Sequence, residues 1–241
     1  FAAVIRHARV LLLDFDGPIC AIFAGHPAQS IARHLAQALA DDGATVPPRV
    51  RDSADPFEVL RFAGTVGARA AEQTEARLRD AELNAVPSAS PTPHAEQLIE
   101  AWRRTGRAVA AVSNNSEAAV TAYARRRQLA LSAIVGRTSA DPLLLKPHPN
   151  LVCRALDILE APAEGGLLLG DSPSDIEAAS RAGLPSIGFA NKPGKRERLI
   201  AAGATFVIDD LAEVAEFFAQ QRLVVLRHVE QTHLQRAAGR G

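Results

Sequence analysis

The chain has 241 residues, of which 47% are apolar and 22% charged, as in an ordinary globular protein with one large domain or one domain carrying a smaller insert. Its 27 basic and 27 acidic residues cancel, so bulk charge gives no support for a surface that binds nucleic acid. The two distant cysteines, Cys20 and Cys153, fit a reduced, cytoplasmic setting, and the early apolar run Val10–Leu13 is too short to span a membrane.

The apolar run Val10–Leu13 predicts a buried parallel strand, which ends in the sequence Asp14-Phe-Asp-Gly17. The next eighty or so residues predict only helices, at 27–40, 56–63 and 65–85. A loop rich in proline and arginine is expected at 45–55, and a linker at 87–93.

From residue 94 onward the pattern changes, because predicted helices and strands alternate. The helices are expected at 94–105, 116–128, 149–160, 173–182, 194–202 and 210–221. The strands are expected at 107–112, 133–136, 166–170, 185–189 and 205–208. Alternation of this kind indicates a parallel sheet covered by helices on both faces, so the sequence predicts an α/β core with a helical insert after its first strand.

Four aspartates follow two of the predicted strands: Asp14 and Asp16 follow the first, and Asp171 and Asp175 follow strand 166–170. Ligands bind at the carboxyl ends of the strands in open parallel sheets, so we expect these carboxylates to converge. Clustered carboxylates resist ionisation unless a positive charge is present, and Mg²⁺ is the usual such ion beside phosphate. Any one aspartate, taken alone, is explained equally well as a cap or turn residue.

Two further segments predict anion-binding groups. Ser113 follows strand 107–112, where its hydroxyl and the backbone N–H groups of a helix start suit an anion, although Ser113 or Asn114 alone is better explained as a helix N-cap. Lys146 is one of only three lysines; a surface position is the simplest interpretation, but in an acidic pocket it would neutralise a carboxylate and a phosphoryl oxygen.

In chain order, these segments resemble the four signature motifs of the haloacid dehalogenase superfamily. Asp14-Phe-Asp-Gly17 resembles its first motif, Ser113 its second, Lys146-Pro147 its third and the run Gly170–Asp175 its fourth. The resemblance is to the phosphoglycolate phosphatase-like branch, in which a helical cap is inserted after the first motif. It implies a Rossmann-like core in residues 1–19 and 91–222 and a helical cap in residues 20–90. Residues 223–241 are left as a tail.

The resemblance also implies a role for each motif residue. Asp14 would attack phosphorus and form an aspartyl-phosphate, while Asp16 would protonate the leaving oxygen and then activate water. The residues implied to hold Mg²⁺ are Asp14, Asp16 through its backbone carbonyl, Asp171 and Asp175. The residues implied to bind the phosphoryl group are Ser113, Asn114, Lys146 and Gly17.

The resemblance therefore implies a magnesium-dependent phosphatase that acts on a small phosphorylated metabolite. Asp16 argues for phosphate esters, because carbon–halogen hydrolases of the family lack this residue. No lysine lies between Gly17 and Lys146, which argues against phosphonate-cleaving relatives that need a cap lysine. Five arginines of the insert are candidates for binding a second acidic group of the substrate, although each alone is better explained as solvated: Arg33, Arg49, Arg51, Arg61 and Arg69.

Three alternative functions would use the same motif residues or the same kind of parallel sheet. A phosphotransferase such as a sugar-phosphate mutase would return the phosphate to its substrate instead of to water. A signalling receiver domain is about half this length and has no long insert, so it is disfavoured. A binding protein without activity is not favoured either, since all four motifs are intact. The sequence does not distinguish a monomer from a homodimer.

Overall fold

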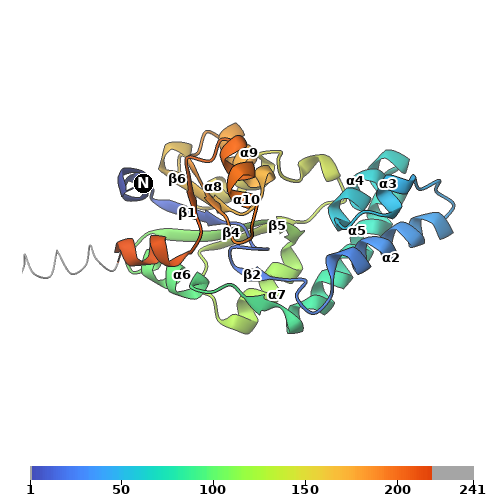
Figure 1. Cartoon of the computed structure of the whole chain (residues 1–241), viewed down its shortest axis with the longest axis horizontal. Coiled ribbons are helices and arrows are strands. Elements are labelled where there is room, and N and C mark those ends of the chain that lie inside the picture. Colours follow the sequence, from blue (N-terminus) through green and yellow to red (C-terminus); the bar gives the residue numbers. More distant parts are fainter. Residues whose placement is uncertain (1, 219–241) are drawn as a thin grey trace, which may run out of the picture.

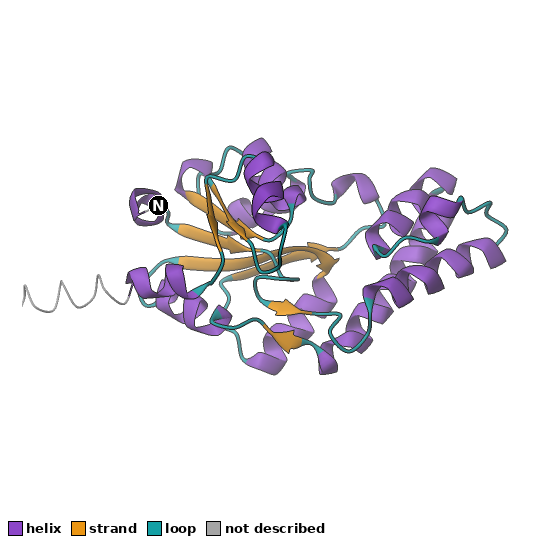
Figure 2. Ribbon diagram, in the orientation of Figure 1, coloured by secondary structure: helices purple, strands orange, loops and turns teal. Residues whose placement is uncertain are grey.

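The computed structural model describes residues 2–218, so the predicted helix end at 219–221 and the tail 223–241 lie outside the described residues. Six parallel strands form one sheet in the order β5-β4-β1-β6-β7-β8 (Figures 1 and 2). Their bounds are β1 Val10–Leu13, β4 Ala108–Ser116, β5 Ala133–Arg137, β6 Gly166–Gly170, β7 Ser186–Phe189 and β8 Phe206–Ile208. The predicted α/β fold with a parallel sheet is confirmed.

Both faces of the sheet are buried, which explains why the strands are continuous apolar runs. Leu11 and Leu13 of β1 face one layer, which holds α1 (Ala2–His7), α6 (Ala95–Arg103), α7 (Glu117–Arg127) and the helical residues 212–218. Val10 and Leu12 face the other layer, which holds α8 (Asn150–Ile158) and α9 (Pro173–Arg181). On that same side Gly188 of β7 lies against Leu199 of α10 (Lys195–Ala201).

Four of the helices between β1 and β4 pack around a separate hydrophobic cluster, at the right of Figure 1. They are α2 (Ala28–Asp41), α3 (Pro48–Arg51), α4 (Pro56–Val66) and α5 (Ala68–Ala85), and we call them the helical insert. The prediction of an uninterrupted loop at 45–55 was wrong, because Pro48 starts the short helix α3. Among residues 2–218, no helix combines the length and the apolar character that crossing a membrane requires.

Two short strands join the insert to the sheet-bearing part of the chain. Cys20–Ala21 (β2) pairs antiparallel with Ser90–Pro91 (β3), and a 3₁₀ turn, η1 (Val86–Ser88), precedes β3. The predicted linker at 87–93 is therefore partly ordered as a strand, which its composition does not reveal. This ladder brings together the two points where the chain leaves the sheet and returns to it.

The loop between β5 and α8 also contacts the helical insert. It contains the 3₁₀ turn η2 (Pro142–Leu144), whose Pro142 lies against Gly64 of α4. The next residue, Leu145, is only 3% exposed and belongs to the hydrophobic cluster of the insert, together with Leu60 and Leu78. The insert therefore packs directly on the residue that precedes Lys146. A third 3₁₀ turn, η3 (Ala163–Gly165), precedes β6.

Strand β4 is longer than predicted, because it continues past residue 112 to Ser116 with a register shift against β5 between Val112 and Ser116. The N-cap of α7 is Ser116, whose side chain accepts a hydrogen bond from the Ala119 N–H at 3.3 Å. The interpretation of Ser113 or Asn114 as the N-cap was therefore wrong. Serine is a good N-cap at either position, so the sequence alone does not separate them.

Candidate active site

Residues from four parts of the chain meet at the carboxyl edge of the sheet. Asp14 follows β1, Asp171 follows β6, Asp175 lies in the first turn of α9, and Lys146 comes from the loop after β5. One carboxylate oxygen from each of the three aspartates lies within 4.8 Å of the other two. Asp14 and Asp175 are buried, with 8% and 0% of their surface exposed. The predicted convergence of these aspartates is thus present in the fold.

Lys146 is the buried cation at the centre of this group. Its Nζ lies 2.7 Å from Asp14 Oδ1 and 2.5 Å from Asp175 Oδ1, and it donates a hydrogen bond to the Val112 carbonyl at 2.9 Å. Only 2% of the residue is exposed, so the interpretation of Lys146 as a surface lysine was wrong. Burial lowers the pKa of Lys146, but the adjacent Asp14 and Asp175 raise it more, so the pKa ends above its ordinary value and the side chain stays charged.

Two lysines, Lys146 and Lys195, pair with the three carboxylates and leave them short of one positive charge. Burial, followed by repulsion from Asp175, raises the pKa of Asp14 well above its ordinary value, and burial also raises the pKa of Asp171. Asp171 has Lys195 and the Asn191 amide as partners. Oxygen donors that are crowded, buried and short of positive charge are what a hard divalent cation binds, so the donor set fits such an ion.

Asp175 has two functions in this arrangement. Its Oδ2 accepts a hydrogen bond from the Ser172 N–H at 3.0 Å, closing a capping box at the start of α9, while its Oδ1 faces Lys146. The structure shows that capping and charge pairing occupy different oxygens of the same side chain.

Asp16 and Gly17 lie beside the cluster. Asp16 accepts a hydrogen bond from the Ile22 N–H at 3.1 Å, and burial raises the pKa of Asp16 to about 6, so near neutral pH it exchanges a proton readily. Gly17 has φ +115°, and a Cβ there would lie 2.3 Å from Asp171 Oδ2, so only glycine allows this close approach. The predicted contact between a metal and the Asp16 backbone carbonyl stays a prediction.

Ser113 and Asn114 are held by neighbouring groups. Ser113, 1% exposed, donates a hydrogen bond to Asn115 Oδ1 and accepts one from the Asn115 N–H, both at 3.1 Å. Asn114 brackets the backbone of Lys146: its Oδ1 accepts from the Lys146 N–H at 2.8 Å, and its Nδ2 donates to the Lys146 carbonyl at 3.3 Å. Asn114 therefore positions Lys146, and its direct contact with phosphate stays a prediction.

Two side chains beside the motif residues, Lys195 and Arg61, make contacts that the sequence did not predict. Lys195 pairs with Asp171, and its only signal was the rarity of lysine in the chain. Arg61 of α4 donates to the Lys146 carbonyl at 3.4 Å and lies 3.7 Å from Asp55. Of the five candidate arginines of the insert, Arg61 is the one that is partly buried and the one that donates a hydrogen bond to a motif residue.

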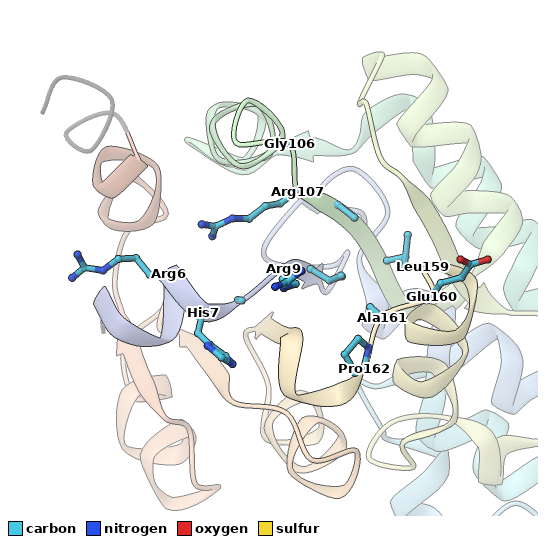
Figure 3. A pocket seen from close by; sticks show the side chains of 12 residues that line it. Arg6, His7, Arg9, Gly106, Arg107, Leu159, Glu160, Ala161 and Pro162 are labelled. Atoms are coloured by element: carbon cyan, nitrogen blue, oxygen red, sulfur yellow. The ribbon is translucent and has the colours of Figure 1, made fainter. Parts of the chain in front are cut away.

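A basic cavity of about 680 Å³ lies elsewhere, at the amino ends of the strands (Figure 3). It is lined by residues that precede or begin β1, β4 and β6, among them Arg6, Arg9 and Arg107. Figure 3 shows the Arg6 side chain pointing away from the other labelled residues. The cavity contains none of the predicted site residues, so it is separate from the candidate active site.

Replacing Asp16 with asparagine is expected to stabilise the metal-free protein, and more so at higher pH. A carboxyl group whose pKa is raised on folding opposes folding once it ionises, so its penalty is absent near pH 4 and complete above the folded-state value. With a pKa of about 6, Asp16 should widen the advantage of Asp16→Asn by about 1 kcal/mol between pH 5.5 and 7.5. Urea unfolding in EDTA measures this; an advantage that shrinks with pH would contradict the burial of a charged Asp16.

Residues 8–183 match the model of a family described as haloacid dehalogenase-like hydrolase. A phosphoglycolate phosphatase of Rhodospirillum rubrum is 27% identical over 230 residues, covering 87% of this chain and 90% of that protein. A plasmid-encoded phosphoglycolate phosphatase of Cupriavidus necator is 30% identical over 137 residues, covering 54% of this chain and 57% of that protein. A crystal structure described as a predicted phosphatase from Clostridium acetobutylicum has a TM-score of 0.66 at 19% identity, covering 88% of this chain and 99% of that one.

Proposed function

Since the chain belongs to the haloacid dehalogenase-like hydrolase family, we propose that it is a magnesium-dependent phosphatase that hydrolyses a small phosphate monoester. The observation that carries this proposal is the buried Asp14 carboxylate, paired with Lys146 and crowded by Asp171 and Asp175. Support also comes from relatives of nearly the same length, since the protein of R. rubrum is named a phosphoglycolate phosphatase.

In the proposed reaction an Asp14 oxygen attacks phosphorus in line with the leaving oxygen. The new O–P bond gives an aspartyl-phosphate, and the bond from phosphorus to the leaving oxygen breaks. Asp16, whose pKa of about 6 keeps part of it protonated near neutral pH, gives its proton to that oxygen. Asp16 then takes a proton from the water that cleaves the aspartyl-phosphate, which restores Asp14 and releases phosphate.

The transferring group is held by Ser113, Lys146 and the backbone at Gly17, with Asn114 fixing Lys146 in place. Mg²⁺ would be held by Asp14, Asp171, Asp175 and the backbone carbonyl of Asp16. Once bound, this ion supplies positive charge that the three carboxylates lack and that the phosphoryl oxygens need. Until then, Lys195 is the partner of Asp171.

We further propose that residues 20–90 act as a cap over a core made of residues 1–19 and 91–222. Arg61, held at the Lys146 carbonyl, is the insert arginine best placed to meet a second acidic group of the substrate. The substrate is then a small phosphorylated metabolite, and neither a nucleic acid nor a membrane. A cytoplasmic setting fits the two free cysteines.

Phosphate release from a panel of small phosphate esters tests the function. The panel should pair phosphorylated carboxylic acids with matched neutral alcohol phosphates, each assayed with Mg²⁺ and with EDTA. We expect release only with Mg²⁺, and faster release from the acids if Arg61 meets a second anion. Phosphate that moves within or between substrates without release would indicate the phosphotransferase instead. Equal release in EDTA would contradict the proposed metal site.

A further inference from the structure

A buried group of charges joins the helical insert to the carboxyl edge of the sheet. Arg137, the last residue of β5, donates two parallel hydrogen bonds to Glu82 of α5, both at 3.1 Å, and one to Glu75 at 3.3 Å. The side chains of Arg137 and Glu82 are 1% and 0% exposed, and that of Glu75 is 9% exposed. Glu75 and Glu82 are seven residues apart, which places them on one face of α5. We call these three residues the Arg137 cluster.

The Arg137 cluster is bonded to the strand segment that carries Ser113. Glu82 Oε2 accepts from the Ser116 N–H at 2.8 Å, and Glu82 Oε1 accepts from Asn115 Nδ2 at 3.1 Å. Since Asn115 is fixed by Glu82 at its Nδ2, its Oδ1 is directed toward the Ser113 hydroxyl, from which it accepts. The insert thereby sets the orientation of Ser113 through a single intervening side chain.

A second path leads from the cluster to Lys146. Arg137 Nη1 donates to the Asn114 carbonyl at 2.7 Å, which fixes the backbone of the residue whose amide brackets Lys146. Lys146 in turn lies between Asp14 and Asp175. Both anion-binding positions are therefore held from the side of the insert, one through Asn115 and the other through Asn114.

Charged contacts are not required simply to hold the helical insert against the sheet. Apolar residues on α5 would bury as well at lower desolvation cost, since buried ion pairs add little stability over well-packed apolar groups. What the charged groups add here is directional hydrogen bonding to three consecutive residues, 114–116, in a stretch where β4 changes register. The charged groups of the Arg137 cluster thus lie where the orientation of neighbouring polar groups matters more than the burial of apolar surface.

We propose that Arg137, Glu82 and Glu75 are positioning residues, which hold Ser113 and Lys146 in the geometry that binds the phosphoryl group. The inference rests on the proposed function for what Ser113 and Lys146 bind. It assigns α5 a role in forming the anion site, besides its place in the insert. It also orders the three residues: Glu82 acts directly on the 113–116 segment, whereas Glu75 acts only through Arg137.

The experiment compares Glu82→Gln, Arg137→Lys and Glu75→Gln with Glu72→Gln, the same change at an exposed position of α5. Each protein is first checked for folding by thermal unfolding and is assayed well below its midpoint. Three quantities are then measured: kcat and KM for the best ester, the affinity for inorganic phosphate in Mg²⁺, and amide hydrogen exchange of residues 113–116. Affinity for Mg²⁺ alone serves as an internal control.

We expect Glu82→Gln and Arg137→Lys to weaken phosphate binding and to lower kcat/KM by about tenfold to a hundredfold, as loss of precise positioning does. Glu75→Gln should have a smaller effect, and Glu72→Gln none, while affinity for Mg²⁺ stays within about twofold in all four. Exchange at 113–116 should be faster in the first two variants. If Glu82→Gln does not fold, Arg137→Lys and Glu75→Gln decide the question.

A purely structural role predicts a different result. Folded variants would then have lower unfolding midpoints but the kcat/KM, phosphate affinity and exchange rates of the unaltered chain, and that result would overturn the inference. If the unaltered chain itself releases no phosphate from any ester, the proposed function fails. Hydrogen exchange at 113–116 and phosphate affinity still test the positioning in that case, so the two failures are distinguishable.

Discussion

Asp14→Asn is expected to lose phosphate release completely while the protein stays folded. The variant keeps the size of the side chain, but its amide is a far weaker nucleophile than a carboxylate, so turnover should fall by about 10³-fold or more. The fold should tolerate the change because the Asp14 charge is buried beside Asp171 and Asp175, and its pKa is raised well above the ordinary value by burial. Lys146 keeps Asp175 as a partner.

Phosphate release and thermal unfolding in EDTA check this expectation together. Removing a crowded negative charge should leave the unfolding midpoint unchanged or higher in the metal-free protein. Asp157→Asn, the same substitution at an exposed position of α8, serves as the control and should have neither effect. Substantial turnover by Asp14→Asn would show that another group attacks phosphorus.

Lys146→Met is expected to impair both activity and stability. Methionine fills similar space but leaves the buried Asp14 and Asp175 without their shared cation, 2.7 and 2.5 Å away. Leaving a buried charge without its partner costs about 3 to 5 kcal/mol of unfolding free energy. Phosphate release should fall by about 10²-fold or more, because a positive charge that stabilises the transferring group is missing.

The pH dependence separates the two effects of this substitution. Lys146 lowers the pKa of Asp14, so without it the Asp14 carboxyl ionises less readily. The loss of stability should therefore be larger at pH 8 than at pH 6 in EDTA, and Mg²⁺ should reverse part of it. Lys192→Met, at an exposed position, is the stability control. A Lys146→Met protein as stable as the unaltered chain at pH 8 would show that the carboxylates do not depend on this lysine.

The sheet was predictable because its signal is local. Runs such as Leu11–Leu13 and Leu167–Leu169 are apolar on both faces, and the polar residues that follow them mark where each strand ends. The convergence of Asp14 and Asp171 then follows from the rule that parallel strands present their carboxyl ends at one edge. The grouping of Asp14, Asp171 and Asp175 could be predicted for this reason, although these residues are far apart along the chain.

The Arg137 cluster was not predicted, because charged residues on a helix are ordinarily solvated. One signal was available. Ala71, Leu78 and Ala85 are buried on one face of α5. Glu75 and Glu82 lie between them on the same face, because all five positions are spaced three or four residues apart. An acidic residue on the apolar face of a helix predicts that a buried partner neutralises it. No local pattern shows that this partner is Arg137, fifty-five residues from Glu82. That pairing depends on how the insert docks on the sheet.

Leu145 has a consequence for any attempt to exchange the helical insert for that of a relative. It is contributed by the sheet-bearing part of the chain, yet it completes the hydrophobic cluster of the insert beside Leu60 and Leu78. If residues 20–90 alone were replaced by the insert of a relative, the new helices would pack against a Leu145 to which they are not matched. The mismatch would lie next to Lys146. Grafts intended to alter substrate selection should carry the segment 142–145 as well, because the two pieces behave as one modular unit.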